Sequence, residues 1–245
     1  LNLLPLSHIF GQVYGLFLPL HFGHQLFFLD SLQPRKIISF IRNKRIHGAV
    51  MIPGLVAALK KALEGTSLRW NLGSQFRLLG VGGAALDSTV EKWWKRHFVL
   101  VVQGYGLTET AAVVSANKPF ASKIGSAGRI AEGVEIKLDS DGEILVRGKN
   151  VTPGYYRDAK KTAQSFTDSW FRTGDIGEIK KGYLYIKERK KDVIKTPAGL
   201  NVYPIDIETI LNKMKEIKES CVLEKDGKIH AVLLLQKKAK HSKIY

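Results

Sequence analysis

The chain has 245 residues, of which 44% are hydrophobic and 9% aromatic, enough to build the core of one large domain or two modest ones. Its formal net charge is +16. A single cysteine, Cys221, excludes an intramolecular disulfide and favours a reducing, cytoplasmic compartment, and its place in the apolar run 220–223 predicts a buried, inert thiol.

The positive charge is compatible with a solvated surface, an acidic membrane surface or a nucleic acid. No arginine-rich helix, zinc-ligand spacing or aromatic RNA-binding motif accompanies the lysines, so nucleic acid is the least favoured partner. The longest apolar run, residues 15–29, is interrupted by Pro19, His21, Gly23 and His24 and is too short to span a bilayer, which leaves peripheral membrane contact. His21 and His24 have no third ligand nearby, so no metal site is predicted there.

The first half alternates short apolar runs with amphipathic stretches. Strands are predicted at residues 26–29, 49–52, 76–81 and 98–102, and helices at residues 34–45, 53–63 and 88–97. Proline stands near the start of the first two helices, and Asp87 is a plausible N-cap of the third. This alternation predicts an α/β fold with a parallel, helix-covered sheet, in which ligands bind beyond the carboxyl ends of the strands.

After Lys123 the pattern changes to strands with period-two alternation. Hairpins are predicted for residues 134–138 with 143–147 and for residues 177–180 with 183–187. A charged linker at 188–192 is followed by a short strand at 193–195, a helix at 204–215 and a hairpin across Asp226-Gly227. The predicted organisation is a large domain over residues 1–187 with an antiparallel β subdomain from about 124, a hinge at 188–192, and the start of a small α+β domain over 193–245.

The stretch QGYGLTET, residues 103–110, has the composition of a nucleotide site. Gly104 and Gly106 let backbone approach a ligand, so a flat ring could lie on Tyr105. The Thr108 hydroxyl could bond a phosphate, and the Glu109 carboxylate could hold Mg²⁺. A glycine-rich turn with a capping threonine is the alternative that these residues leave open.

Six motifs in order resemble the acyl-adenylate-forming, AMP-binding enzymes, which include acyl-CoA synthetases, luciferases and peptide-synthetase adenylation domains. They are PLSHIFG (5–11), GVGGAAL (80–86), QGYGLTET (103–110), GEILVRGKNVTPGYY (142–156), WFRTGDIG (170–177) and ERKKDVIKTPAGLNVYPIDIE (188–208). The segments LPLSHIFGQ, YLYIKERKK and NVYPIDIE are most similar to bacterial long-chain acyl-CoA synthetases. The resemblance implies that a fatty acid, ATP with Mg²⁺, and coenzyme A are the substrates.

The resemblance also implies a role for each motif residue. Nucleotide contacts fall on Gly82, Gly83, Ala84, Gln103, Gly104, Tyr105, Gly106, Thr108, Asp175 and Arg189, with Asp175 on the ribose hydroxyls and Glu109 on magnesium. The acyl and pantetheine contacts fall on His8, Gly82, Gly106 and Gly199, and Lys191 is the hinge about which the small domain turns.

Other interpretations of these residues stay open. GVGGAAL has the glycine spacing of a dinucleotide fingerprint, but no acidic residue follows at the expected distance. Asp175 follows a glycine in what reads as a tight turn, where an aspartate can cap its own backbone. Lys190 and its neighbours can be a solvated linker, and His8 can be structural.

Three departures from the family pattern are visible. The Ser/Thr/Gly-rich loop that cradles the ATP phosphates and the glycine-lysine segment with the adenylating lysine are both missing, and Glu188 replaces the usual hinge glycine. We therefore expect the chain to be an internal fragment that is inactive by itself. Transfer to a carrier protein, or a non-catalytic module that binds an adenylate or an anionic surface, is the alternative function.

Overall fold

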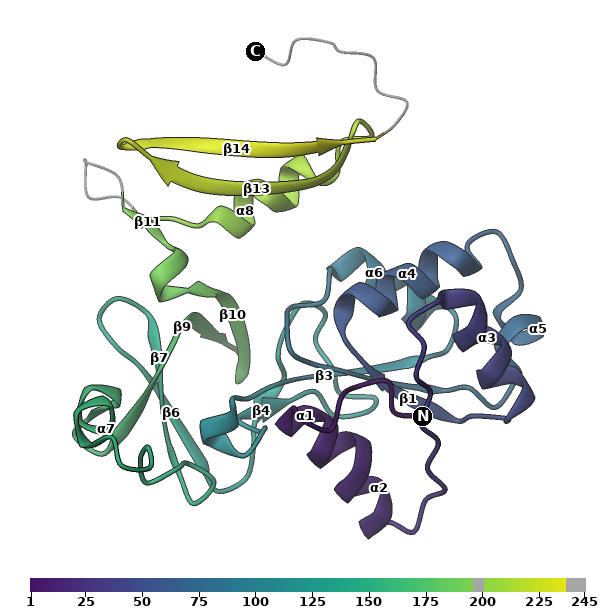
Figure 1. The fold of residues 1–245 in the computed structure, drawn as a ribbon, viewed down its shortest axis with the longest axis horizontal. Helices are drawn as coiled ribbons and strands as arrows, with labels where there is room; N and C mark the ends of the chain where they lie inside the picture. Colours follow the sequence, from purple (N-terminus) through teal and green to yellow (C-terminus); the bar gives the residue numbers. More distant parts are fainter. Residues whose placement is uncertain (196–200, 237–245) are drawn as a thin grey trace. The chain divides into compact units, whose positions relative to one another are not determined.

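The computed structural model describes residues 1–195 and 201–236 (Figure 1). The chain divides into two compact units. The first unit comprises Leu1–Lys137, Leu145–Thr173 and Ile179–Ile186, and the second comprises Leu138–Ile144, Gly174–Glu178 and Lys187–Tyr245. No helix in the described part of the chain is long and apolar enough to cross a membrane.

The first unit is built on a sheet that begins with three parallel strands. They are β1 (Gly48–Met51), β2 (Leu78–Val81) and β3 (Leu100–Tyr105), and the short strands β4 (Ser115–Ala116) and β5 (Arg129–Ile130) follow in the order β1-β2-β3-β4-β5. β1, β2 and β3 pair in parallel, whereas β4 pairs antiparallel with both β3 and β5. The predicted parallel sheet is confirmed.

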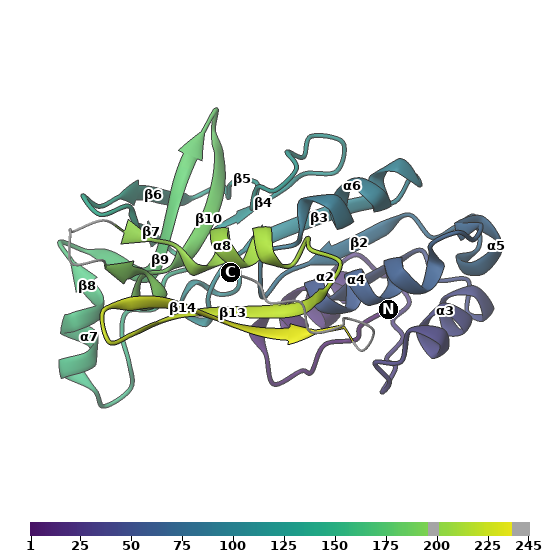
Figure 2. The same ribbon diagram turned by 90° about the horizontal axis from the view of Figure 1, so that it is seen from above.

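Helices lie on both faces of this sheet. Figure 1 shows α3 (Pro34–Asn43), α4 (Pro53–Leu63) and α6 (Ser88–Arg96) over one face, with the short α5 (Leu68–Leu72) beside them. The continuous helical segment α1 (Ile9–Gln12), η1 (Val13–Phe17) and α2 (Leu18–His21) lies on the other side. In the view from above, α4 and α6 run side by side along the strands (Figure 2).

The helix starts follow the signals in the sequence. α3 and α4 begin at prolines, which suit the first turn because a proline there gives up no helical hydrogen bond. The Asp87 carboxylate caps α6 by accepting from the amides of Thr89 at 2.7 Å and Val90 at 3.2 Å. Trp94 on α6 is fully buried, and its indole donates to the Val56 carbonyl of α4 at 3.3 Å, which joins the two helices over the sheet.

Several strand predictions in this unit were wrong in place or extent, and the strand predicted at 76–81 begins at Leu78. Residues 26–29 form no strand, and only Phe28 makes an isolated bridge, to Asn2. The strand predicted at 98–102 begins at Leu100 and continues to Tyr105. Phe98 belongs instead to the turn after α6, with φ of +61° and 82% of its surface exposed.

The antiparallel hairpins are confirmed. Strands β6 (Val134–Leu138), β7 (Glu143–Gly148), β9 (Trp170–Lys180) and β10 (Tyr183–Arg189) form a sheet in the order β10-β9-β7-β6, and β8 (Phe166–Thr167) pairs with β9. The helix α7 (Ala159–Ser165) precedes β8. β9 is longer than predicted, because the whole WFRTGDIGEIK stretch is extended.

The C-terminal part of the second unit is a small α+β arrangement. After η3 (Lys190–Asp192), β11 (Ile194–Lys195) pairs with β12 (Asn201–Val202), and α8 (Pro204–Leu211) precedes the hairpin of β13 (Ile217–Lys225) and β14 (Lys228–Leu235). The helix ends at Leu211, four residues before the predicted end at 215.

The expectation of a buried thiol was wrong, because Cys221 is exposed. Its neighbours Ser220 and Val222 on β13 are buried. Successive strand residues point to opposite faces, and α8 packs against β13. A two-stranded sheet with one covered face therefore leaves Cys221 toward solvent.

Candidate functional site

Three predicted motifs converge at the carboxyl ends of β2 and β3 in the first unit. Val81 pairs with Gln103, so the glycine-rich turn after β2 begins beside the last residues of β3. Gly82 is buried, and a Cβ placed there would lie 2.8 Å from the ring of Phe10, which brings α1 to the same place. Gly83 (φ +86°) follows in the exposed part of the turn. This is the edge where a parallel sheet is expected to bind its ligand.

Gln103 carries an unsatisfied acceptor at this edge. The residue is only 6% exposed, and its Oε1 has no hydrogen-bond partner within the described residues. Buried polar atoms are nearly always paired, because desolvation without a partner is costly. An N–H or O–H donor of a bound ligand would satisfy this oxygen.

Tyr105, the predicted adenine platform, is half-buried as the last residue of β3 and pairs with Ser115 of β4. Gly106, which follows Tyr105, was predicted to let the backbone approach a ligand, and the structure gives a second reason for a glycine there. A Cβ there would lie 2.3 Å from the backbone carbon and oxygen of Ala112. The close approach at Gly106 is therefore to the chain's own backbone, whereas Gly104 is less crowded, with the Ser115 carbonyl oxygen 3.3 Å from a Cβ.

We expect Gly106→Ala to lower the free energy of unfolding by roughly 1–3 kcal/mol, because a methyl group must push Ala112 aside. Gly54→Ala is the matched control, since a Cβ at Gly54 in α4 would meet nothing within 4 Å. Urea unfolding of the two variants measures both effects. Equal midpoints for the variants would contradict the packing reason given for Gly106.

Thr108 and Glu109 lie in the short helix η2 (Thr108–Thr110), which is fixed by a loop that follows β7. The Asn150 amide donates to the carbonyl oxygens of Thr110 at 2.9 Å and Val113 at 2.6 Å. The Thr152 amide donates to the Glu109 carbonyl oxygen at 2.8 Å. These bonds hold the end of η2 and the residues after it, and Thr108 at its start is exposed.

The Glu109 side chain is held by a residue that the sequence did not single out. The Tyr155 hydroxyl donates to Glu109 Oε1 at 2.8 Å, and burial, reinforced by this carboxylate, raises the pKa of Tyr155. A half-buried carboxylate in this position suits Mg²⁺, which binds through one or two carboxylates together with substrate phosphates. Asn150 and Tyr155 both lie in the motif GEILVRGKNVTPGYY, which was the available signal.

In the second unit Asp175 is buried within β9, so the predicted tight turn at this position was wrong. Its Oδ1 lies 2.9 Å from Nε of Arg189, the last residue of β10. Gly174 precedes it with φ of +69°, a left-handed conformation that favours glycine. The structure thus brings two predicted ribose and nucleotide contacts together as an ion pair.

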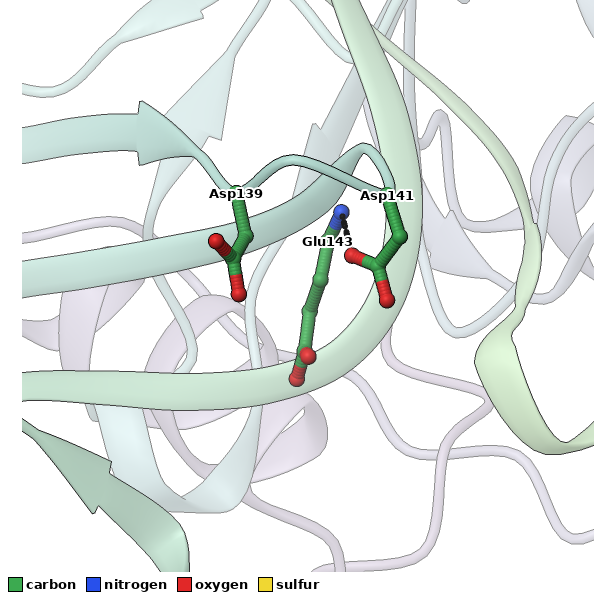
Figure 3. A group of neighbouring side chains, drawn as sticks. All are labelled: Asp139, Asp141 and Glu143. Atoms are coloured by element: carbon green, nitrogen blue, oxygen red, sulfur yellow. Dashed lines mark hydrogen bonds between the residues drawn. The ribbon is translucent and has the colours of Figure 1, made fainter.

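Three carboxylates gather at the turn between β6 and β7, those of Asp139, Asp141 and Glu143 (Figure 3). The Lys190 ammonium lies 2.5 Å from Asp141 Oδ2 and 2.7 Å from Glu143 Oε2. Its hydrogen bond lowers the pKa of Asp141, while Asp141 and then Glu143 raise the pKa of Lys190. Lys190 is therefore ion-paired, and the alternative of a solvated linker residue was wrong.

The Lys190–Asp141 pair predicts part of the acid sensitivity of the fold. The folded-state pKa of Asp141 lies below its unfolded value of about 3.9, so the pair stabilises the fold above about pH 4 and the stabilisation is lost as pH falls through the lower, folded value. We expect the melting-temperature difference between wild type and Lys190→Met to shrink from pH 6 to about pH 3. A difference that stays constant over this range would contradict the assignment.

A cavity of about 680 Å³ in the second unit is lined by Gly174, Arg189, Lys190, Lys191 and Asp192. Arg189, Lys190 and Lys191 are cationic, but Arg189 is paired with Asp175, and Lys190 with Asp141 and Glu143. Lys191, the predicted hinge residue, is exposed in η3. Of the other predicted site residues, Ala84 is exposed beside Gly83, His8 is exposed at the start of α1, and Gly199 lies outside the described residues.

Comparison with known proteins identifies relatives over most of the chain. A model of the AMP-binding enzyme family matches residues 1–156. A 2-succinylbenzoate–CoA ligase of Listeria monocytogenes is 33% identical over 205 residues, which cover 82% of this chain and 43% of that protein. The long-chain-fatty-acid–CoA ligase FadD15 of Mycobacterium tuberculosis is 36% identical over 176 residues, which cover 70% of this chain and 29% of that protein.

A solved structure supports the same relationship. The o-succinylbenzoate CoA synthetase of Bacillus subtilis, in complex with its acyl-adenylate intermediate, superposes with a TM-score of 0.84 at 28% identity, over 98% of this chain and 52% of that protein. The same enzyme has been solved with ATP and magnesium ion. The chain thus spans about half the length of that synthetase, and a smaller share of the length of the two ligases named above. With the family model matched over residues 1–156, the chain belongs to the AMP-binding enzymes.

Proposed function

We propose that the complete protein is an acid–CoA ligase. It would activate a carboxylic acid with ATP to an acyl-adenylate and pyrophosphate, and then transfer the acyl group to the thiol of coenzyme A. The observation that carries this proposal is the convergence of GVGGAAL and QGYGLTET at the carboxyl ends of β2 and β3, where the Gln103 oxygen has no hydrogen-bond partner within the described residues. The relatives named as CoA ligases support it.

In this proposal the first unit supplies the adenine, phosphate and metal contacts. Tyr105 stacks on adenine, with the backbone of residues 82–84, Gln103, Gly104 and Gly106 around it. Thr108 binds phosphate, and Glu109 together with the ATP phosphates holds Mg²⁺, which would neutralise charge at the reacting phosphate. These residues act by positioning and electrostatic stabilisation.

The second unit supplies the ribose contact and the hinge. Asp175 accepts hydrogen bonds from the ribose hydroxyls, Arg189 steadies the nucleotide, and Lys191 is the pivot at a domain boundary at 188–192. Arginine suits phosphate and ribose oxygens because its donors form a rigid fork. The cavity that Gly174, Arg189 and Lys191 help to line supports these roles.

A fatty acid is the proposed acid, with His8 at the acyl site. The similarity of LPLSHIFGQ and NVYPIDIE to long-chain ligases and the mycobacterial relative support it. The Listeria and Bacillus relatives favour a second candidate, an aryl acid of the 2-succinylbenzoate type. A net charge of +16 supports peripheral contact with an acidic membrane, from which a fatty acid could be drawn.

The test is thioester formation by the complete protein with ATP, Mg²⁺ and coenzyme A. Palmitate and 2-succinylbenzoate are offered separately, and acyl-CoA and AMP are measured by chromatography. A second arm replaces coenzyme A with a phosphopantetheinylated carrier protein, to identify the acceptor. AMP binding without pyrophosphate release for any acid would favour the non-catalytic alternative and reject the proposal.

A further inference from the structure

The deepest carboxylate of the acidic turn, Glu143, is nearly inaccessible to water. The residue is 2% exposed, whereas Asp139 and Asp141 in the same turn are exposed. In Figure 3 the Glu143 side chain extends away from its own turn, past the two aspartates. A carboxylate that is taken out of water in this way requires partners for both oxygens.

Each oxygen of Glu143 has a partner, and these partners include groups of different kinds. Oε2 receives the Lys190 ammonium at 2.7 Å. Oε1 accepts from the backbone amide of Gly174 at 3.1 Å. Glu143 therefore connects Lys190 to Gly174. Lys190 follows Arg189 in the chain and Gly174 precedes Asp175, and Arg189 and Asp175 form the ion pair described above.

The Gly174 contact is important because of its backbone conformation. Gly174 adopts φ of +69° inside a strand, which is not the conformation that β pairing would impose on it. The hydrogen bond from the Gly174 N–H to Glu143 fixes the Thr173–Gly174 peptide, one residue before Asp175, and so constrains the backbone from which the aspartate side chain projects. The Lys190 ammonium pairs with the buried Glu143 carboxylate, and hydrogen bonds to such a charged group are shorter and stronger than neutral ones.

The acidic turn has another interpretation, as a site for a divalent cation. One oxygen from each of the three carboxylates lies within 4.8 Å of the others. The Lys190 ammonium bonds to both Asp141 and Glu143, however, and so supplies the positive charge that the cluster requires. The cluster is better explained as the group of carboxylates that pairs with the Lys190 ammonium.

We propose that Glu143, paired with Lys190, is a positioning residue that orients Asp175 toward the ribose hydroxyls of the nucleotide. This inference rests on the proposed function, because it takes the ribose contact of Asp175 from there. In this inference, the selectivity for ATP over a nucleotide that lacks the ribose hydroxyls depends on Glu143, a residue that does not contact the nucleotide. Loss of Glu143 should reduce that selectivity before it reduces the binding of the adenine and phosphates.

The test compares ATP with 2′,3′-dideoxy-ATP in pyrophosphate release by the complete protein. The readout is the KM for 2′,3′-dideoxy-ATP divided by the KM for ATP. A general loss of stability would not change this ratio. We expect Glu143→Gln to reduce this ratio roughly tenfold, because a small misplacement of a contacting group is costly. Lys190→Met should do the same, Lys190→Arg should retain the wild-type ratio, and the double variant Glu143→Gln/Lys190→Met should be no worse than either single one.

Glu135→Gln is the matched control. Glu135 lies on β6 and pairs with Arg147 at 2.6 Å, but this pair is on the surface, so its loss should leave the KM ratio unchanged. If Asp175→Asn abolishes the selectivity while Glu143→Gln leaves it intact, the positioning role is wrong and the ribose contact stands. If Asp175→Asn itself has no effect on the ratio, the ribose contact is wrong and the positioning role is rejected with it.

Discussion

Asp175→Asn in the complete protein is expected to raise the KM for ATP about 10- to 100-fold. An ionised carboxylate accepts hydrogen bonds from two ribose hydroxyls, and a hydrogen bond to a charged group contributes roughly 1.5–3 kcal/mol, of which each 1.4 kcal/mol is about tenfold in affinity. Asparagine keeps the shape of the side chain and loses the charge. Steady-state kinetics with varied ATP at saturating acid and coenzyme A measures the effect.

A loss of folding stability must be separated from this result. Asp175 is buried and paired with Arg189, whose side chain is 48% exposed and can be solvated when the pair is lost. Loss of a buried charge can be costly for the fold, so the melting temperature of Asp175→Asn is measured beside its kinetics, and the KM for ATP is compared at a temperature where the variant is folded. Unchanged ATP kinetics in a folded Asp175→Asn protein would show that the buried Asp175–Arg189 pair is structural.

The elements that the sequence predicted well are those with local start signals. Pro34 and Pro53 begin α3 and α4, and the Asp87 side chain caps α6, as their sequence positions indicated. The turns Asp141-Gly142 and Asp226-Gly227 close the predicted hairpins. These signals depend on backbone geometry within a few residues, so they can be read without knowing the tertiary fold.

The misassigned elements depended on partners that the sequence does not show. The apolar residues 26–29 have strand composition, yet only Phe28 finds a pairing partner. Gly174 suggested a turn at Asp175, but the pairing of β9 with its neighbours carries the chain through as a strand. Cys221 lies in an apolar run, and only the position of α8 decides which face of β13 is covered.

The same distinction applies to the candidate site. The motifs identified Tyr105, Thr108, Glu109, Asp175 and Arg189 as a set, but not the residues that hold them. The Tyr155–Glu109 bond joins residues 46 positions apart, and the Lys190–Glu143 bond joins residues 47 apart. Local pattern does not reveal pairs at such separations, and they are where the structure adds most to the functional argument.

Glu109→Gln is expected to reduce the rate of acyl-adenylate formation about 10²- to 10³-fold, the range found when one electrostatic contact to a transition state is removed. Glutamine can still accept from the Tyr155 hydroxyl, so the turn should stay in place, but an amide is a much weaker ligand than a carboxylate for Mg²⁺. The apparent Mg²⁺ affinity, measured by titration at fixed ATP, should fall with the rate.

Tyr155→Phe is the matched change, because it keeps the charge of Glu109 and removes the hydroxyl that orients it at 2.8 Å. We expect this variant to lose only about 10-fold in rate, the order seen when an outer-shell partner of a metal ligand is removed. Addition of Mg²⁺ should recover part of the loss in Tyr155→Phe and little of it in Glu109→Gln. Equal, magnesium-independent losses in the two variants would instead mean that the pair stabilises the turn around η2, and that the metal is held elsewhere.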